Sequence, residues 1–129
     1  MKEEGLKFDN GKTRYELVPP EALEEITKVL TFGATKYADR NWEKGIKYSR
    51  VFGACMRHLW AWWRGEDKDP ETGLSHLAHA GCCIFFLLTF EQRKMDDFND
   101  SPRGNRLRAV LIAKQILDDP SHNKRERRR

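Results

Sequence analysis

Two histidines one helical turn apart, preceded by an acidic turn, are the residues of this sequence best suited to chemistry. His76 and His79 are three positions apart, so on a helix they share one face. Four carboxylates lie just before them, between residues 66 and 71. Carboxylate oxygens bind Mg²⁺ or Mn²⁺, and a neighbouring imidazole binds a softer metal or transfers a proton. The residues expected to hold the metal are Glu66, Asp67 and Asp69.

A third histidine, His58, falls within the apolar stripe of an earlier helix, where a lone histidine is usually a core residue. Arg57 and Arg64 on the same helix offer cationic donors suited to phosphate. We therefore expect His58, His76 and His79 to be candidate catalytic residues. The competing interpretation is structural, because acidic residues before a helix also stabilise its dipole without any metal.

Basic and aromatic residues alternate in an N-terminal arm and again after the first expected helix. Cations neutralise phosphates and an aromatic ring stacks on a base, although solvated loop charges with anchoring aromatics give the same pattern. The sequence lacks the Gly-x-x-x-x-Gly-Lys-Ser/Thr phosphate loop, Gly-x-Gly-x-x-Gly, His-Glu-x-x-His and an adjacent His-Asp pair, which disfavours those enzyme classes. The candidate nucleotide-binding residues are Lys7, Lys12, Arg14, Lys36, Tyr37, Arg40, Trp42 and Arg57.

Helices must position these groups, because no stretch shows the alternation of a strand. We expect the first helix over residues 20–37 and the second between Ser49 as its N-cap and a stop at Gly65. A third is expected over residues 73–92, and a weaker one over residues 105–117. The third is apolar almost all round, which indicates burial by neighbours or by a second copy of the chain. The fold class is thus an all-α bundle of three long helices plus a C-terminal helix, expected to be oligomeric. Residues expected to cover the open side of the core are Leu107, Val110, Leu111 and Leu117.

Charge divides the chain into parts. Residues 1–93, an arm and a nucleotide-binding helical domain, carry 14 charges of each sign, so the net charge of +4 falls beyond them. Residues 94–120 are expected to form a linker and the C-terminal helix. Residues 121–129 are expected to be a disordered basic tail that contacts nucleic acid weakly and in a salt-dependent manner.

Cysteine usage and hydropathy indicate a cytoplasmic protein. Cys55, Cys82 and Cys83 lie in apolar segments and lack Cys-x-x-Cys spacing, as expected for core thiols in a reducing compartment. No apolar run reaches the roughly 18 to 20 residues of a membrane span, and the polar start lacks the apolar region of a signal peptide. We therefore expect no membrane association.

Several segments resemble the N-terminal domain of phage dATP/dGTP diphosphohydrolases across about residues 6 to 91. They include Lys7-Phe8-Asp9-Asn10-Gly11-Lys12, Pro19-Pro20-Glu21-Ala22-Leu23, Arg57-His58-Leu59-x-Ala61-Trp62-Trp63-Arg64-Gly65-Glu66-Asp67 and His76-Leu77-x-His79-Ala80. The resemblance implies a MazG-like all-α nucleotide pyrophosphohydrolase that assembles as an oligomer. It further implies metal-dependent cleavage of purine dNTPs to dNMP and pyrophosphate, in the host cytoplasm if the chain is phage-encoded.

One departure from the MazG pattern leaves two alternatives open. MazG enzymes carry Glu-Glu-x-x-Glu on one helix and Glu-x-x-Asp on another, and the corresponding positions here are Gly53, Ala54 and Arg57, then His76-Leu77-Ala78-His79. Either the acidic turn, with Glu21, Glu24 or Glu25, supplies the metal ligands, or the pocket binds a nucleotide or cyclic nucleotide without cleaving it. The partner is a purine nucleotide or a cyclic nucleotide accordingly.

Overall fold

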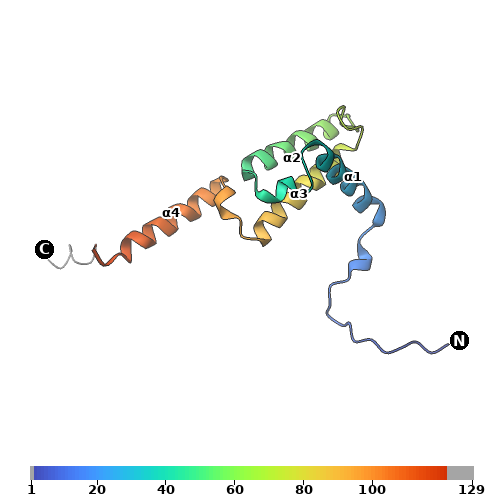
Figure 1. Ribbon diagram of the computed structural model, residues 1–129, viewed down its shortest axis with the longest axis horizontal. Coiled ribbons are helices and arrows are strands. Elements are labelled where there is room, and N and C mark those ends of the chain that lie inside the picture. The colour runs from blue at the N-terminus through green and yellow to red at the C-terminus, as the bar shows by residue number, and fades with distance from the viewer. Residues whose placement is uncertain (1, 122–129) are drawn as a thin grey trace.

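The computed structural model describes residues 2–121, whose helices form close to the segments that the sequence predicts (Figure 1). The four long helices are α1 (Pro20–Lys36), α2 (Tyr48–Trp63), α3 (His76–Gln92) and α4 (Pro102–Leu117), with short 3-10 helices η1 (Tyr15–Leu17), η2 (Asn41–Lys44) and η3 (Asp96–Phe98). Across residues 2–121 there is no strand, only an isolated antiparallel bridge between Lys68 and Ser75. The all-α prediction is confirmed, whereas the MazG-like arrangement and the oligomer stay predictions.

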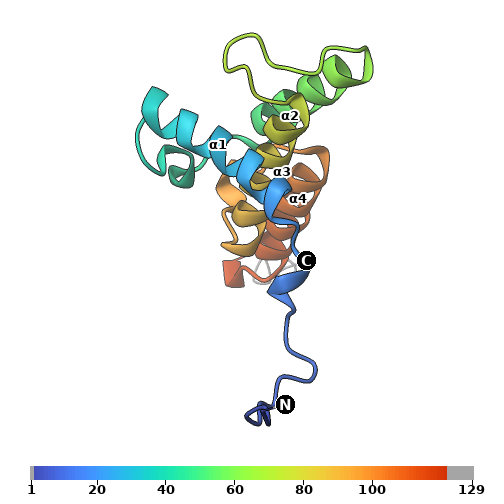
Figure 2. The same ribbon diagram turned by 90° about the vertical axis from the view of Figure 1, so that its right-hand side faces the viewer.

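α2 and α3 form an antiparallel pair, and α1 lies across α3 (Figures 1 and 2). Contacts run in opposite order along the pair, because the Tyr48 ring stacks on Phe90 at 5.7 Å between ring centroids while the Cys55 thiol donates to the carbonyl of Ala80. The core between them is a cluster of Val51, Cys55, Ala80, Cys83 and Phe90. A second cluster, of Val29, Ala78 and Cys82, joins α1 to α3.

The three cysteines are free and buried, as predicted for core thiols. Desolvation raises the pKa of Cys82 to about 12 and that of Cys83 to about 11, with the neighbouring thiol adding to each rise. Both sulfurs are therefore protonated at neutral pH and are poor nucleophiles and metal ligands.

Two helix starts differ from the sequence prediction. α2 begins at Tyr48 after Lys47, so Ser49 is not its N-cap. Instead the Ser49 hydroxyl donates to Asp100 at 2.5 Å, a tertiary contact that local sequence does not reveal. α3 begins three residues later than predicted, where the Ser75 side chain accepts the backbone N–H of Leu77. Gly65 has φ of 104° and follows the end of α2, as predicted.

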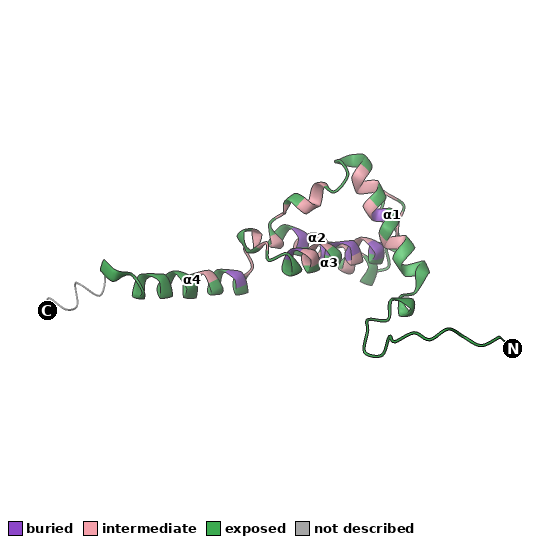
Figure 3. Ribbon diagram, turned by 60° about the horizontal axis from the view of Figure 1, so that its bottom comes forward, coloured by how far each residue is buried: buried purple, intermediate pink, exposed green. Residues whose placement is uncertain are grey.

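The prediction that the C-terminal helix covers the core is wrong. α4 projects from the three-helix body and is exposed along nearly its whole length (Figure 3). Leu107 is 52% exposed and Val110, Leu111 and Leu117 are 63–65% exposed. α4 starts at a local cap, because the Ser101 hydroxyl accepts the N–H of Gly104 at 3.0 Å and Gly104 packs on Asn99. These contacts lie within the segment that leads into α4 and do not hold the helix against the core.

None of the helices within residues 2–121 is long and apolar enough to cross a membrane. Most of the basic tail predicted for residues 121–129 lies outside the described residues, and only Ser121 is described.

Candidate functional site

A groove of 1540 Å³ lies between the C-terminal half of α1, η2, and the facing sides of α2 and α3. Cations, aromatic rings, imidazoles and carboxylates all contribute to its walls. The predicted site residues among its lining are Lys36, Tyr37, Arg40, Trp42, Arg57, His58, Asp69 and His79. The fold therefore brings most of the predicted nucleotide-binding residues to the same place as two of the three predicted catalytic histidines.

The cationic wall contains residues that sequence reasoning missed. Arg50 and Arg93 also line the groove. Arg50 lies seven positions before Arg57, two turns along one face of α2, so the helical period was the available signal. Arg93 follows α3 and pairs with Glu43 at 3.4 Å, a contact between distant segments with no local signature.

The two aromatic candidates are placed differently. Trp42 stacks on Phe86 with centroids 4.4 Å apart and planes at 16°, so one face of the indole belongs to the core. Tyr37, in contrast, is 66% exposed at the end of α1. The amino group of Lys36 lies 5.4 Å from the Tyr37 ring centroid and 2.7 Å from Glu71. Tyr37 is therefore the freer surface for stacking on a base.

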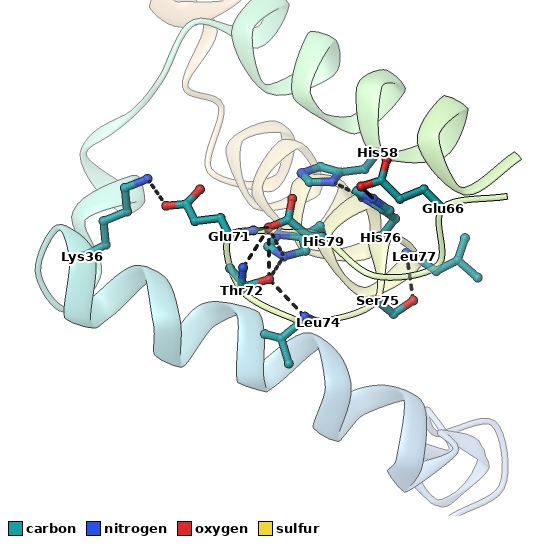
Figure 4. A network of polar contacts seen from close by, with 11 residues as sticks. Lys36, His58, Glu66, Glu71, Thr72, Leu74, Ser75, His76, Leu77 and His79 are labelled. Carbon is teal, nitrogen blue, oxygen red and sulfur yellow. Dashed lines mark hydrogen bonds and ion pairs between the residues drawn. The ribbon is translucent and has the colours of Figure 1, made fainter. Parts of the chain in front are cut away.

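The three histidines converge beside the groove because α2 and α3 pack antiparallel (Figure 4). His58 from α2 meets His76 from the first turn of α3, with their Nδ1 atoms 2.9 Å apart. The His79 ring stacks on His58 with centroids 4.5 Å apart and planes at 11°. His58 and His79 line the groove, whereas His76 is buried behind them and only 4% exposed.

Asp69 anchors the connector between α2 and α3 and faces these rings. Its Oδ2 accepts the backbone N–H groups of Glu71 and Thr72 at 3.1 and 3.0 Å, and the Thr72 hydroxyl lies 3.2 Å away. The same hydroxyl is 2.7 Å from His79 Nε2. Sequence reasoning missed Thr72, although an Asp followed by a Thr three residues later in a turn is a recognisable side-chain-to-backbone pattern.

The protonation states in this cluster follow from burial and hydrogen bonding. Desolvation lowers the pKa of His58 and of His79, and the nearby imidazole charges lower them further against the opposing effect of Asp69. Burial acts to raise the pKa of Asp69, but hydrogen bonds from Thr72 and the charges of His79 and His58 outweigh it and lower the pKa. At neutral pH the cluster thus combines neutral His58 and His79 with an ionised carboxylate.

The predicted three-carboxylate metal site is not assembled. Within residues 2–121, the group of three ligand-bearing side chains with atoms within 4.8 Å of one another is His58, Asp69 and His76. Glu66 instead lies 3.6 Å from His76 Nε2, and Asp67 contributes its backbone carbonyl, which accepts the N–H of His76 at 3.0 Å.

The cations of the arm lie away from this groove. Lys7, Lys12 and Arg14 are exposed and precede α1, whereas the groove is at the other end of that helix. Figure 2 shows the arm leaving the body on the side opposite the connector between α2 and α3. Arg14 pairs with Glu16 at 2.7 Å. The described structure does not bring these three predicted residues to the site.

Comparison with known proteins gives a family but no structural counterpart. A dATP/dGTP diphosphohydrolase of Salmonella phage PMBT28 is 41% identical over 83 residues, which is 64% of this chain and 28% of the relative's length. The chain thus spans under a third of that protein. No solved structure matches it significantly. The family model described as dATP/dGTP diphosphohydrolase, N-terminal, matches residues 2–100, and the chain therefore belongs to that family.

Proposed function

We propose that this chain is a metal-dependent nucleotide diphosphohydrolase that cleaves purine dNTPs to dNMP and pyrophosphate in the groove. The observation that carries the proposal is the meeting, in one groove, of phosphate-binding cations with the imidazole and carboxylate cluster. The dATP/dGTP activity in the name of the phage relative supports a purine substrate.

The groove residues have distinct roles in this reaction. Lys36, Arg40 and Arg57 bind the polyphosphate and neutralise the charge that develops on it. Tyr37 stacks on the base. Water attacks the α-phosphorus, its oxygen forms the new bond, and the bridging bond to the β-phosphate breaks to release pyrophosphate.

The neutral imidazoles supply proton transfer. His79 lines the groove, and because the Thr72 hydroxyl donates to Asp69, His79 Nε2–H donates to that hydroxyl. This leaves Nδ1 of His79 to accept the proton of the attacking water. His58 stacks against it and keeps the ring in position. The ionised Asp69 fits a divalent ion, since Mg²⁺ or Mn²⁺ commonly binds one carboxylate together with substrate phosphates. Such an ion would polarise the phosphate and lower the pKa of bound water.

The test is to incubate the full chain with each dNTP and NTP, with and without Mg²⁺ or Mn²⁺, and to identify products by chromatography and mass spectrometry. Metal-dependent formation of dNMP and pyrophosphate from dATP and dGTP is expected. Arg57→Ala should lower kcat/KM, while Arg103→Ala, on α4 outside the groove, should not. No turnover, or release of phosphate and dNDP, would contradict the proposal.

A second function is favoured by one observation. Gly53, Ala54 and Arg57 stand where MazG enzymes carry their first carboxylate motif, and Glu66 and Asp67 do not join Asp69 in a group of three ligands. This chain would then bind a purine or cyclic nucleotide without cleaving it. Intact ligand recovered from denatured protein, together with metal-independent binding, is the expected result for that function, and recovery of cleaved product alone would exclude it.

A further inference from the structure

We infer that His58, His76 and Asp69 form a binding site for one divalent transition-metal ion, with Glu66 orienting the His76 ring. One ligand atom from each of the three side chains lies within 4.8 Å of the other two. The site differs from the carboxylate cluster expected from the sequence, and it concerns the protein without nucleotide. It therefore holds whether or not the chain hydrolyses nucleotides.

The spacing of the imidazoles suits coordination. The Nδ1 atoms of His58 and His76 are 2.9 Å apart. Nitrogen ligands lie about 2.0–2.1 Å from zinc, so two of them are separated by about 3 Å at a right angle and by slightly more in a tetrahedron. The ring centroids are 5.2 Å apart, so the two Nδ1 atoms face each other directly. An ion can thus replace the single imidazole–imidazole hydrogen bond once both rings turn their Nδ1 atoms toward it.

The far side of the His76 ring gives an independent indication. Its Nε2 atom is buried and has no hydrogen-bond partner among residues 2–121. A buried polar atom without a partner is costly and uncommon. Glu66 Oε1 lies 3.6 Å from it. A metal-bound histidine usually donates its second ring N–H to a carboxylate, so a small approach of Glu66 would satisfy Nε2 and leave the Nδ1 lone pair for the ion.

The carboxylate ligand is prepared for the same role. Asp69 uses Oδ2 for the backbone N–H groups of Glu71 and Thr72, which fixes the orientation of the carboxylate. Its Oδ1 accepts no hydrogen bond from the described residues and remains available as a ligand.

The donor set indicates the class of ion. Two imidazoles and one carboxylate favour Zn²⁺, Co²⁺ or Mn²⁺ over Mg²⁺, which prefers oxygen ligands. Cysteine does not contribute, since the thiols are buried and protonated. Three protein ligands leave a position for water or a phosphate oxygen, as in catalytic zinc sites.

His79 is excluded from the ligand set and serves as the matched control. It is not one of the three side chains whose ligand atoms come within 4.8 Å. Its ring stacks on His58 and its Nε2 is engaged with Thr72 at 2.7 Å. Replacing His79, a histidine of the same cluster that is not a ligand, should therefore leave the ion in place.

The experiment is titration of the chelator-stripped full chain with Zn²⁺ by isothermal calorimetry and with Co²⁺ by visible absorption. We expect one ion per chain with His79→Gln and with His122→Asn, the latter controlling for the remaining histidine. His58→Asn, His76→Asn and Asp69→Asn should lose the site. Glu66→Gln, at an exposed carboxylate, should bind Zn²⁺ about 10- to 100-fold more weakly.

The outcomes separate this inference from the proposed function. Circular dichroism checks folding, and Glu66→Gln keeps the test decisive if a buried-ligand variant unfolds. Absence of Zn²⁺ binding, binding unaffected by Glu66→Gln and His58→Asn, or an ultraviolet Co²⁺–thiolate band would overturn the inference. A chain that binds Zn²⁺ through these residues but cleaves no dNTP keeps the metal site and loses the hydrolase. Cleavage with Mg²⁺ alone, without a Zn²⁺ site, does the reverse.

Discussion

At the scale of single residues, the histidine cluster joins His58 to two histidines that are 18 and 21 positions further along the sequence. His58 and His76 come within 2.9 Å only because α2 and α3 are antiparallel and joined by a connector that Asp69 pins at its centre. Partial burial lowers the pKa values of His58 and His79 and keeps these two rings neutral, so stability is lost whenever they are forced to take a proton.

The first prediction follows from that cost. The pKa values of His58 and His79 are lowered from 6.5 in the folded state, so near and just below pH 6.5 the unfolded chain binds more protons than the folded chain. The free energy of unfolding should therefore fall as pH is lowered from about 7 through this window. The melting temperature should fall likewise in a thermal scan, and less steeply in the double variant His58→Asn, His79→Gln. A melting temperature independent of pH between about 5 and 7 would contradict the burial of neutral imidazoles.

The second prediction separates His79 from the other two imidazoles. His79→Gln removes the proton acceptor of the proposed reaction, so kcat for dGTP cleavage should fall by about 100-fold or more. KM and the Zn²⁺ stoichiometry should change little, because the ligand set and the phosphate-binding cations remain. A variant with wild-type kcat would remove His79 from the mechanism.

The sequence identified the residues that line the groove better than it identified which of them contact one another. The three histidines, Asp69 and the groove cations Lys36, Arg40 and Arg57 stood out by type and spacing. The mutual geometry did not, because whether Glu66 or Asp69 approaches a ring depends on the path of the connector. Arm residues such as Lys12 and Arg14 had the same local pattern as true groove residues and differ only in tertiary position.

At the scale of elements, two connecting segments set how the walls of the groove meet. The segment between α1 and α2 includes η2, which is followed by Gly45, whose φ is 103°. A Cβ atom built on Gly45 would overlap the Phe98 ring, with its nearest atoms at 2.3 to 2.7 Å. This close approach ties the η2 segment to η3, beyond the end of α3, so Gly45 is required both for its backbone conformation and for space.

The third prediction uses a glycine with almost the same backbone. Gly65 has φ of 104°, but nothing lies within 4 Å of its Cβ position. Gly65→Ala should cost about 1–3 kcal/mol from backbone strain alone. Gly45→Ala should cost a further 1–3 kcal/mol or so from overpacking against Phe98. Urea unfolding of both variants measures the difference, and equal destabilisation would mean that the Phe98 ring moves aside freely.

Helix content was predictable from the sequence because the apolar period and the Pro20 and Gly65 signals are local. α1 ends one residue from the predicted boundary, and α3 ends at the predicted residue. The errors arise where tertiary contacts decide. Ser49 is a residue type that is common at helix N-caps, but its hydroxyl hydrogen-bonds Asp100, 51 positions away. α3 begins later than predicted because the turn around Asp69 occupies the preceding residues.

At the scale of the whole molecule, two apolar surfaces lack a partner within the described chain. On α3, Ile84, Phe85 and Leu88 are 39–52% exposed, and α4 exposes apolar residues along most of its length. A 16-residue helix without tertiary packing is marginal in water, because helix nucleation is costly and most helical stability in proteins comes from packing. The sequence indicated that these residues are covered, and its prediction that α4 covers the core of its own chain was wrong.

The fourth prediction assigns both surfaces to a second copy of the chain, as expected from the apolar character of α3. The full chain should then form a dimer or larger oligomer in size-exclusion chromatography with light scattering. Truncation after residue 101 removes the apolar residues of α4 and should lower the oligomer mass. Ile84→Glu with Leu88→Glu should also lower it, while Lys114→Glu, a polar position on α4, serves as the charge control.

Circular dichroism should show that the truncated chain keeps α1 to α3, because their core clusters contain no residue of α4. A monomeric full chain would contradict the assignment. In a monomer α4 has no packing to stabilise it, so truncation should remove much less helical circular dichroism signal than 16 helical residues give.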